Sequence, residues 1–303
     1  MFVGAVAVNG RHVKGAARHD DARRVLLDVL LRFGRTVVSA GLVLLVLWLN
    51  GVISPAEAGG RYTKKGPCAK DLDSCTPRGC ADVDTDLSSE DREAEALLNM
   101  LKRTQPQNGT PIQLTFAHFV KLQQLADDLV GQGQALSAEQ RSRLRDLRLS
   151  ESRTVSEGDL VELRGFIVQD SPRPKPSGPE SVNCRLTRAA NNDIHIPIVE
   201  EAQDEEFAAI VVEMIPQARP GSWNPTKLKG AARGERPVII RGRLFYDNKH
   251  EVNDDSERDN GQPKRFSLWE IHPISEFWVC IRADRKCGET LSKPKDWKKL
   301  ADF

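Results

Sequence analysis

The spacing of apolar residues changes from helical to strand-like at Glu157, and this change constrains the fold more than any other feature of the chain. Val161 and Leu163 alternate with charged residues, as expected of a half-buried strand. Four further extended regions follow, at residues 181–186 resuming at 193–199, and at residues 208–215, 238–246 and 267–280. One short helix, capped by Asn224 with Pro225 at its first position, is expected between the third and fourth strands. The connections leave no room for parallel crossovers, so the pattern predicts a small antiparallel sheet.

This order of strands, with the helix between the third and the fourth, resembles the OB-fold, a five-stranded Greek-key barrel. The resemblance covers residues 157–281 and depends on topology. It implies an α+β protein in which a short N-terminal helical segment precedes a small antiparallel OB-like barrel stapled by disulfides. A jelly roll or a lipocalin-type barrel needs more strands.

The helical segment before the barrel, residues 88–150, carries apolar residues at helical spacing. Three helices are expected in it, beginning near Ser88, Thr115 and Ser137, where polar side chains can cap the first turn. Leu147 is expected on the inner face of the third helix.

Two segments flank these regions. Residues 59–87 are rich in Gly, Pro, Asp and Cys and show no period, so they are expected to form a loop held by disulfides. The tail, residues 282–303, is rich in lysine and is expected to be peripheral.

The first 58 residues have the pattern of an export signal. Arginines precede an uncharged run from Val37 to Leu49, and Ala56-Glu57-Ala58 follows. A basic start, a short apolar stretch and a small-x-small end are typical of a cleavable signal peptide. The run is shorter than the roughly 20 residues that span a bilayer, so an uncleaved membrane anchor is the lesser alternative. We expect cleavage near Ala58 and a periplasmic or secreted protein.

All six cysteines follow this leader, and an even number in an oxidising compartment indicates disulfides. They are Cys68, Cys75, Cys80, Cys184, Cys280 and Cys287. Since Cys184 and Cys280 both lie in strand-like runs, they are the best candidates for one pair. Zinc is the rival interpretation, but the sequence contains no Cys-x-x-Cys.

The three histidines of the predicted barrel each lie within three residues of a carboxylate. The pairs are Asp193 with His195, Asp247 with His250, and Glu270 with His272. Two of these pairs have i, i+2 spacing, which places both side chains on one face of a strand. If the faces converge, the six residues could act as a catalytic cluster, with His195, His250 and His272 as ligands of a divalent metal. The alternative is that they are solvated residues on the outer face of the sheet.

Glu213 is the other carboxylate inside an apolar run, and a buried acid needs a partner. Arg219, Arg241 and Arg243 are the candidate partners.

The tract Tyr246-Asp247-x-x-His250, followed by Trp269-Glu270-Ile271-His272-Pro273, resembles a group of exported bacterial proteins that carry W-E-I-H-P. The resemblance implies an OB-fold-like domain and export, and it implies no chemistry.

Charge limits the classes of partner. Between Glu157 and Ile281 the chain has 21 acidic residues and 16 lysines and arginines, whereas binding to a nucleic-acid backbone needs a basic groove. Nucleic acid is therefore disfavoured as a partner. The leading hypothesis is a non-catalytic binding module for a polar ligand or protein partner. The alternative is a metal-dependent hydrolase of the nuclease or phosphodiesterase type, using the His/carboxylate cluster.

Overall fold

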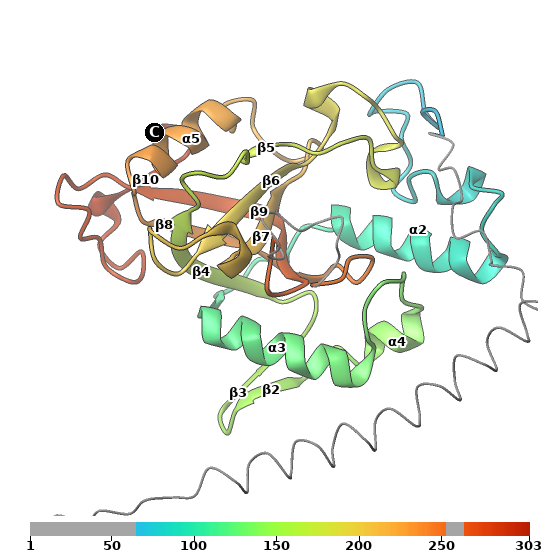
Figure 1. Cartoon of the computed structure of the whole chain (residues 1–303), viewed down its shortest axis with the longest axis horizontal. Coiled ribbons are helices and arrows are strands. Elements are labelled where there is room, and N and C mark those ends of the chain that lie inside the picture. The colour runs from blue at the N-terminus through green and yellow to red at the C-terminus, as the bar shows by residue number, and fades with distance from the viewer. Residues whose placement is uncertain (1–64, 253–263) are drawn as a thin grey trace, which may run out of the picture. The chain divides into compact units, whose positions relative to one another are not determined.

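Five strands close into a barrel (Figure 1). They are β4 (Leu160–Ile167), β6 (Ile194–Val199), β7 (Ile210–Met214), β8 (Val238–Tyr246) and β9 (Trp269–Cys280). The barrel belongs to a computed structural model that describes residues 65–252 and 264–303. Around the barrel, β4 pairs with β6, β6 with β7, β7 with β9, β9 with β8, and β8 with β4. The β7–β9 pairing is parallel and the other four are antiparallel.

Helix α5 (Pro225–Arg233) connects β7 to β8, at the place that the sequence predicts. Asn224 caps it by accepting a hydrogen bond from the Lys227 backbone N–H, which satisfies one of the free donors of the first turn. Leu228 and Ala231 on its inner face pack into the main hydrophobic core.

Three barrel strands place apolar side chains in the main core and polar side chains on their outer face. Ile196, Val212 and Ile271 belong to the main core. Because side chains alternate along a strand, the residues between them, including His195 and Glu213, lie on the outer face of β6, β7 and β9.

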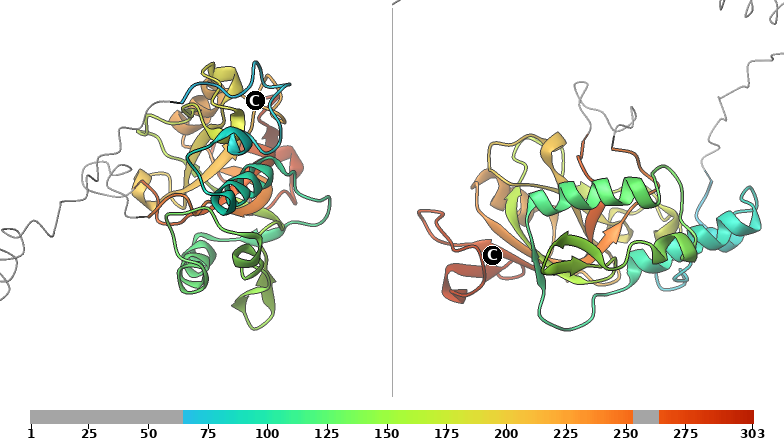
Figure 2. Two further views of the ribbon diagram at one scale, coloured as in Figure 1. Left: turned by 90° about the vertical axis from the view of Figure 1, so that its right-hand side faces the viewer. Right: turned by 90° about the horizontal axis from the view of Figure 1, so that it is seen from below.

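Helices and short strands precede the barrel. They are α2 (Ser89–Arg103), β1 (Ile112–Leu114), α3 (Phe116–Leu129), α4 (Ala138–Ser142), β2 (Leu147–Ser150) and β3 (Arg153–Val155). Ser88, Thr115 and Ser137 are the N-caps of α2, α3 and α4. Helices α2 and α3 lie outside the barrel (Figure 2). The indole N–H of Trp269 in β9 donates a hydrogen bond to the Leu122 carbonyl oxygen of α3.

The third helix is shorter than predicted. It ends at Ser142, and Leu147 lies in β2, where Leu147 and Leu149 are buried and Arg148 is exposed. Asp146, at φ 52°, turns the chain between the two elements. Residues 147–150 therefore form a strand and not the end of a helix, because their alternation of buried and exposed side chains fits pairing with β3.

The remaining elements are short. They are η1 (Ala81–Val83), β5 (Lys175–Pro176), η2 (Ser181–Asn183), η3 (Ala189–Asn191), η4 (Glu206–Ala208), η6 (Pro294–Asp296) and β10 (Trp297–Lys299). The prediction of an extended run from residue 181 is wrong, since a 3-10 turn ends there at Cys184, which has φ 52°. The prediction of a peripheral tail is wrong in part. Strand β10 pairs with β9, and Trp297 and Leu300 are buried.

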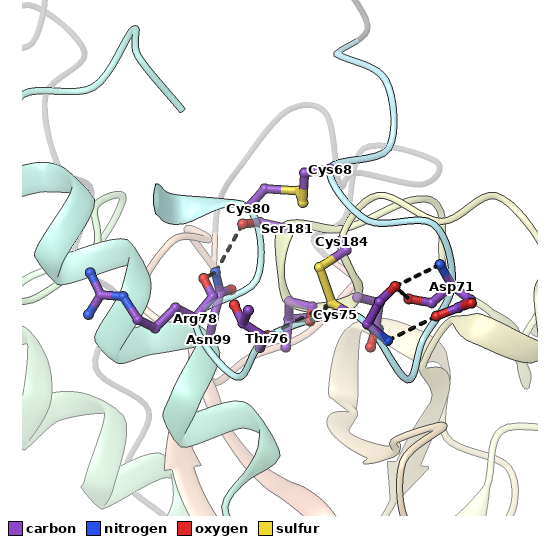
Figure 3. Close-up of a disulfide and its surroundings, with 12 residues drawn as sticks. Cys68, Asp71, Cys75, Thr76, Arg78, Cys80, Asn99, Ser181 and Cys184 are labelled. Carbon is purple, nitrogen blue, oxygen red and sulfur yellow. Dashed lines mark hydrogen bonds between the residues drawn. A yellow bond between two sulfur atoms is a disulfide. The ribbon is translucent and has the colours of Figure 1, made fainter. Parts of the chain in front are cut away.

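Three disulfides staple the fold: Cys68–Cys80, Cys75–Cys184 and Cys280–Cys287. The predicted Cys184–Cys280 pair is wrong, because Cys184 packs in a turn against the Cys-rich segment and Cys280 meets a cysteine seven residues further on. Figure 3 shows Cys75 bonded to Cys184, with Asn99 of α2 donating to Ser181 Oγ nearby. The disulfide and α2 thus fasten the N-terminal segment to the loop before β6.

In residues 65–252 and 264–303, no helix has the length and apolar character needed to cross a membrane. The predicted signal peptide, with its cleavage site near Ala58, lies outside the described residues.

Candidate metal centre

The outer face of β6, β7 and β9 gathers two of the three predicted His/carboxylate pairs. His195 of β6 lies directly opposite Glu213 of β7. On the other side of β7, the parallel register places Val212 beside Ile271, so Glu270 and His272 flank the same face. Neighbouring strands therefore bring these side chains together.

Glu213 is the centre of this group. Its Oε1 lies 3.1 Å from His195 Nε2, and its Oε2 lies 3.2 Å from His272 Nδ1. His272 Nδ1 is also 3.5 Å from Glu270 Oε2, and His272 Nε2 is 3.9 Å from Asp193 Oδ2. Four of the six residues predicted from the sequence thus lie in one group, in which His195 and His272 contact Glu213, a carboxylate that was not among the six.

Asp247 and His250, the third predicted pair, lie beside this group and are held from α2. Lys102 Nζ lies 2.6 Å from Asp247 Oδ2, and His250 Nε2 lies 3.7 Å from the same oxygen. Glu180 connects the two parts, since its carboxylate is 3.5 Å from His195 Nε2 and 4.0 Å from Lys102 Nζ.

The ligand geometry differs from the predicted set of three histidines. Asp193, Glu213 and His272 each offer one ligand atom, and these atoms all lie within 4.8 Å of one another. Within the described part of the chain, His195, His250 and His272 form no such group. Cys68, Cys80 and Cys184 also come this close, but all three are disulfide-bonded.

The Asp193/Glu213/His272 group is closed to solvent, and four of its polar atoms make no hydrogen bond. The three side chains are at most 2% exposed. Asp193 Oδ2, Glu213 Oε2 and both ring nitrogens of His272 make no hydrogen bond of acceptable geometry. Asn183 donates to the other Asp193 oxygen at 3.1 Å. Buried polar atoms are normally hydrogen-bonded, whereas these atoms have ion-pair contacts with one another and no hydrogen bond. Such a group has ligand atoms available for a cation.

The charges point in the same direction. Four buried carboxylates face two permanent cations, which leaves an excess of two negative charges when the histidines are neutral. The carboxylates are Asp193, Glu213, Asp247 and Glu270, and the cations are Lys102 and Arg265, the latter 2.6 Å from Glu270. Protonated imidazoles can neutralise this excess, and so can one divalent cation.

In the metal-free protein, the neighbours shift several pKa values. Burial raises the pKa of Asp193 to about 6, although His272 opposes the shift. Burial disfavours the charged form of His195, but Glu213 and Glu180 overcome this effect and raise the pKa of His195 to about 9. Burial and the nearby Glu213 also raise the pKa of Glu270. Protons therefore occupy part of this cluster at neutral pH.

The partners expected for Glu213 are not the ones it has. Arg219 donates to the backbone carbonyls of Asn192 and Met214, and Arg241 pairs with Glu162. The histidines take this role, and the signal that could have identified them is the i, i+2 spacing on the flanking strands. No sequence signal separates Lys102 from the other basic residues of α2.

Comparison of the sequence with protein families, curated proteins and solved structures finds no match.

Proposed function

We propose that this protein is an exported, non-catalytic barrel protein that holds a divalent metal ion at Asp193, Glu213 and His272. The observation that carries the proposal is the convergence of three ligand atoms within 4.8 Å of one another, with buried atoms that make no hydrogen bond on each of the three residues.

The ligand set favours a particular class of metal. Two carboxylates and one imidazole suit Zn²⁺ or Mn²⁺, because imidazole favours transition metals and carboxylate oxygens accept harder cations. Since the side chains are closed to solvent, the proposed role is structural. Closed sites are typical of metals that stabilise a fold, whereas catalytic sites keep one open position. The ion would join the loop before β6 to β7 and β9.

We also propose that the barrel is of the OB type. The closed order β4-β6-β7-β9-β8 and the position of α5 between the third and fourth strands support this assignment. OB-folds bind their ligands on the second and third strands, which here are β6 and β7. Helix α2 packs against β9 and η2, and Lys102 reaches into the cluster on this face. A polar ligand or protein partner of the binding module is therefore expected to use another surface.

Export is supported by the disulfides. All six cysteines are paired, and proteins of oxidising compartments commonly have such bonds. Expression of the full chain in a bacterium, followed by N-terminal sequencing of the periplasmic fraction, tests this part. A new N-terminus near Gly59 is expected, and a cytoplasmic protein with intact residues 1–58 would contradict it.

One observation favours the hydrolase alternative. The side chain of His195 is 16% exposed and contacts Glu213, and its raised pKa of about 9 makes it a proton donor beside the proposed metal near neutral pH. Hydrolysis of bis(p-nitrophenyl) phosphate by the Zn²⁺- or Mn²⁺-loaded protein would support a catalytic role if the activity were lost in His195→Ala.

Metal analysis tests the main proposal. The full chain, purified without an affinity tag, is expected to contain about one metal ion per molecule after dialysis, and to lose it to a strong chelator with a fall in Tm. Glu213→Gln and His272→Gln should abolish stoichiometric binding. Glu276→Gln on β9 is the matched control, because Glu276 pairs with Arg241 outside the cluster. A metal-free wild type whose Tm does not respond to added Zn²⁺ or Mn²⁺ would refute the proposal.

A further inference from the structure

Arg243 of β8 is a buried guanidinium without a carboxylate partner. The residue is 7% exposed. Its Nη1 donates to the Leu101 carbonyl oxygen at 3.3 Å, and in the described residues no carboxylate oxygen lies within 4.0 Å of its guanidinium nitrogens. Burial lowers the pKa of Arg243, although Glu157 opposes the shift. Buried charges in proteins are normally paired.

Two buried arginines have carboxylate partners. Arg141 pairs with Glu157, and Arg265 pairs with Glu270. Arg219 has no carboxylate partner either, but it donates to the carbonyl oxygens of four residues. Arg243 donates to one backbone acceptor, and none of its nitrogens is among the buried atoms without a hydrogen bond. Its remaining N–H groups are therefore open to solvent or to a ligand.

The guanidinium lines a surface pocket of about 510 Å³. Arg145 also lines it, as do the polar residues of the loop after α2, residues 104–110. Gly158 borders the pocket at φ +106°, a conformation that L side chains rarely adopt, and a Cβ there would lie 3.2 Å from Arg243 Nη2. The glycine therefore leaves the space next to the guanidinium open.

Two carboxylates also line the pocket, but each already has a partner. Glu157 accepts hydrogen bonds from Arg141 and from the Tyr246 backbone N–H. Asp159 accepts one from the Ser156 backbone N–H. Neither reaches Arg243 within ion-pair distance, so the buried positive charge faces a space of ligand size.

We propose that this pocket binds an oxyanion, the phosphate or carboxylate group of a small polar ligand. Arg243 is the buried anchor, since its planar fork matches two oxygens of such a group. Arg145 supplies a second positive charge, and Gln105 and Asn108 are candidate neutral donors. The site is independent of the metal centre and gives the binding module a class of ligand.

Titration of the full chain with inorganic phosphate and with acetate, at constant ionic strength, tests the proposal by calorimetry and by the shift in Tm. Saturable binding of at least one anion is expected. Arg243→Lys keeps the charge but loses the fork, so it should weaken binding about tenfold, and Arg243→Gln should weaken it further. A preference for phosphate or for acetate identifies the ligand group.

Arg145 keeps the test falsifiable if the Arg243 variants fail to fold. Arg145 is exposed, so Arg145→Gln should leave Tm unchanged while it weakens anion binding several-fold. Arg148→Gln is the matched control, because Arg148 is an exposed arginine of β2 that does not line the pocket. No saturable binding of either anion to the wild type, or equal losses in Arg145→Gln and Arg148→Gln, would overturn the proposal.

Discussion

Removal of the Lys102 charge is expected to destabilise the protein more than any change of an exposed lysine. Lys102 Nζ lies 2.6 Å from Asp247 Oδ2, and the two side chains are 9% and 1% exposed. Lys102→Met keeps an apolar stem of similar length but removes the ammonium group that pairs with the buried Asp247 carboxylate. The remaining neighbour of that carboxylate is His250, whose Nε2 lies 3.7 Å from Asp247 Oδ2.

The magnitude follows from this burial. Removing one partner of a buried pair costs about 3–5 kcal/mol, because the remaining charge loses its compensation. Since about 1 kcal/mol corresponds to roughly 2–4 °C in Tm for a domain of this size, the variant should melt about 6–20 °C below the wild type. The double variant Lys102→Met with Asp247→Leu should recover part of this loss, because it leaves no unpaired charge at the pair.

The loss of stability in Lys102→Met should depend on pH. Burial alone would raise the pKa of Asp247, but Lys102 and His250 lower it below its ordinary value. A carboxylate with a lowered folded-state pKa contributes stability above its unfolded pKa of about 3.9, and this contribution is lost as the pH falls through the folded value. The difference between wild type and Lys102→Met should therefore be largest near neutral pH and should shrink in acid.

Urea unfolding followed by circular dichroism at neutral pH and in acid measures this difference. Lys298→Met on the exposed side of β10 is the control, with an expected change of about 0.5 kcal/mol or less. A loss below about 1 kcal/mol at neutral pH, or a difference that grows as the pH falls, would refute the reasoning.

Two further predictions concern the covalent frame and the packing of the barrel. Loop entropy predicts that replacing Cys75 and Cys184 with serine lowers the free energy of unfolding by about 4.7 kcal/mol, and that replacing Cys280 and Cys287 lowers it by about 2.5 kcal/mol, because the second disulfide closes a much shorter loop. Thermal unfolding of both double-serine variants measures the two losses. A larger loss of stability for the Cys280/Cys287 variant would contradict the prediction. Gly242→Ala should lower Tm by several degrees, because the added Cβ would lie 2.4 Å from the Pro273 carbonyl oxygen. Gly109→Ala is the control, since a Cβ there would have no atom within 4 Å, and it should have little effect on Tm. Equal Tm values for the two variants would show that the barrel relaxes around the added methyl group.

The barrel strands and helix α5 follow from local sequence signals, whereas closure of the barrel was expected only from the resemblance of their order to the OB-fold. Val161 and Leu163 alternate with polar residues, and Asn224 with Pro225 marks the start of α5. Strand alternation and helix caps are encoded within a few residues, so a single sequence is enough to place them. Leu147 shows the limit, since a short segment fits both periods until its pairing partner is known.

The candidate site was less accessible to prediction because it combines residues that are distant in the sequence. His195 and His272 could be named from their spacing to carboxylates, but that Glu213 bridges them depends on the register of three strands. The contact between Lys102 and Asp247 depends on how α2 packs against the barrel, which the sequence of the barrel does not reveal. The pairing of Cys75 with Cys184 likewise depends on a turn where an extended run was expected.

The Cys75–Cys184 bond also determines how the protein would respond to mechanical tension. When the molecule is pulled between Cys75 and its C-terminus, the shortest covalent path crosses from Cys75 to Cys184 and continues through β6. Helices α2 to α4 and strand β4 lie in the bypassed loop and carry no load along the backbone. We therefore expect single-molecule stretching to show a shorter extension in the oxidised protein than after reduction, with the bypassed contour length of about 3.3–3.6 Å per residue released when the bond is cut.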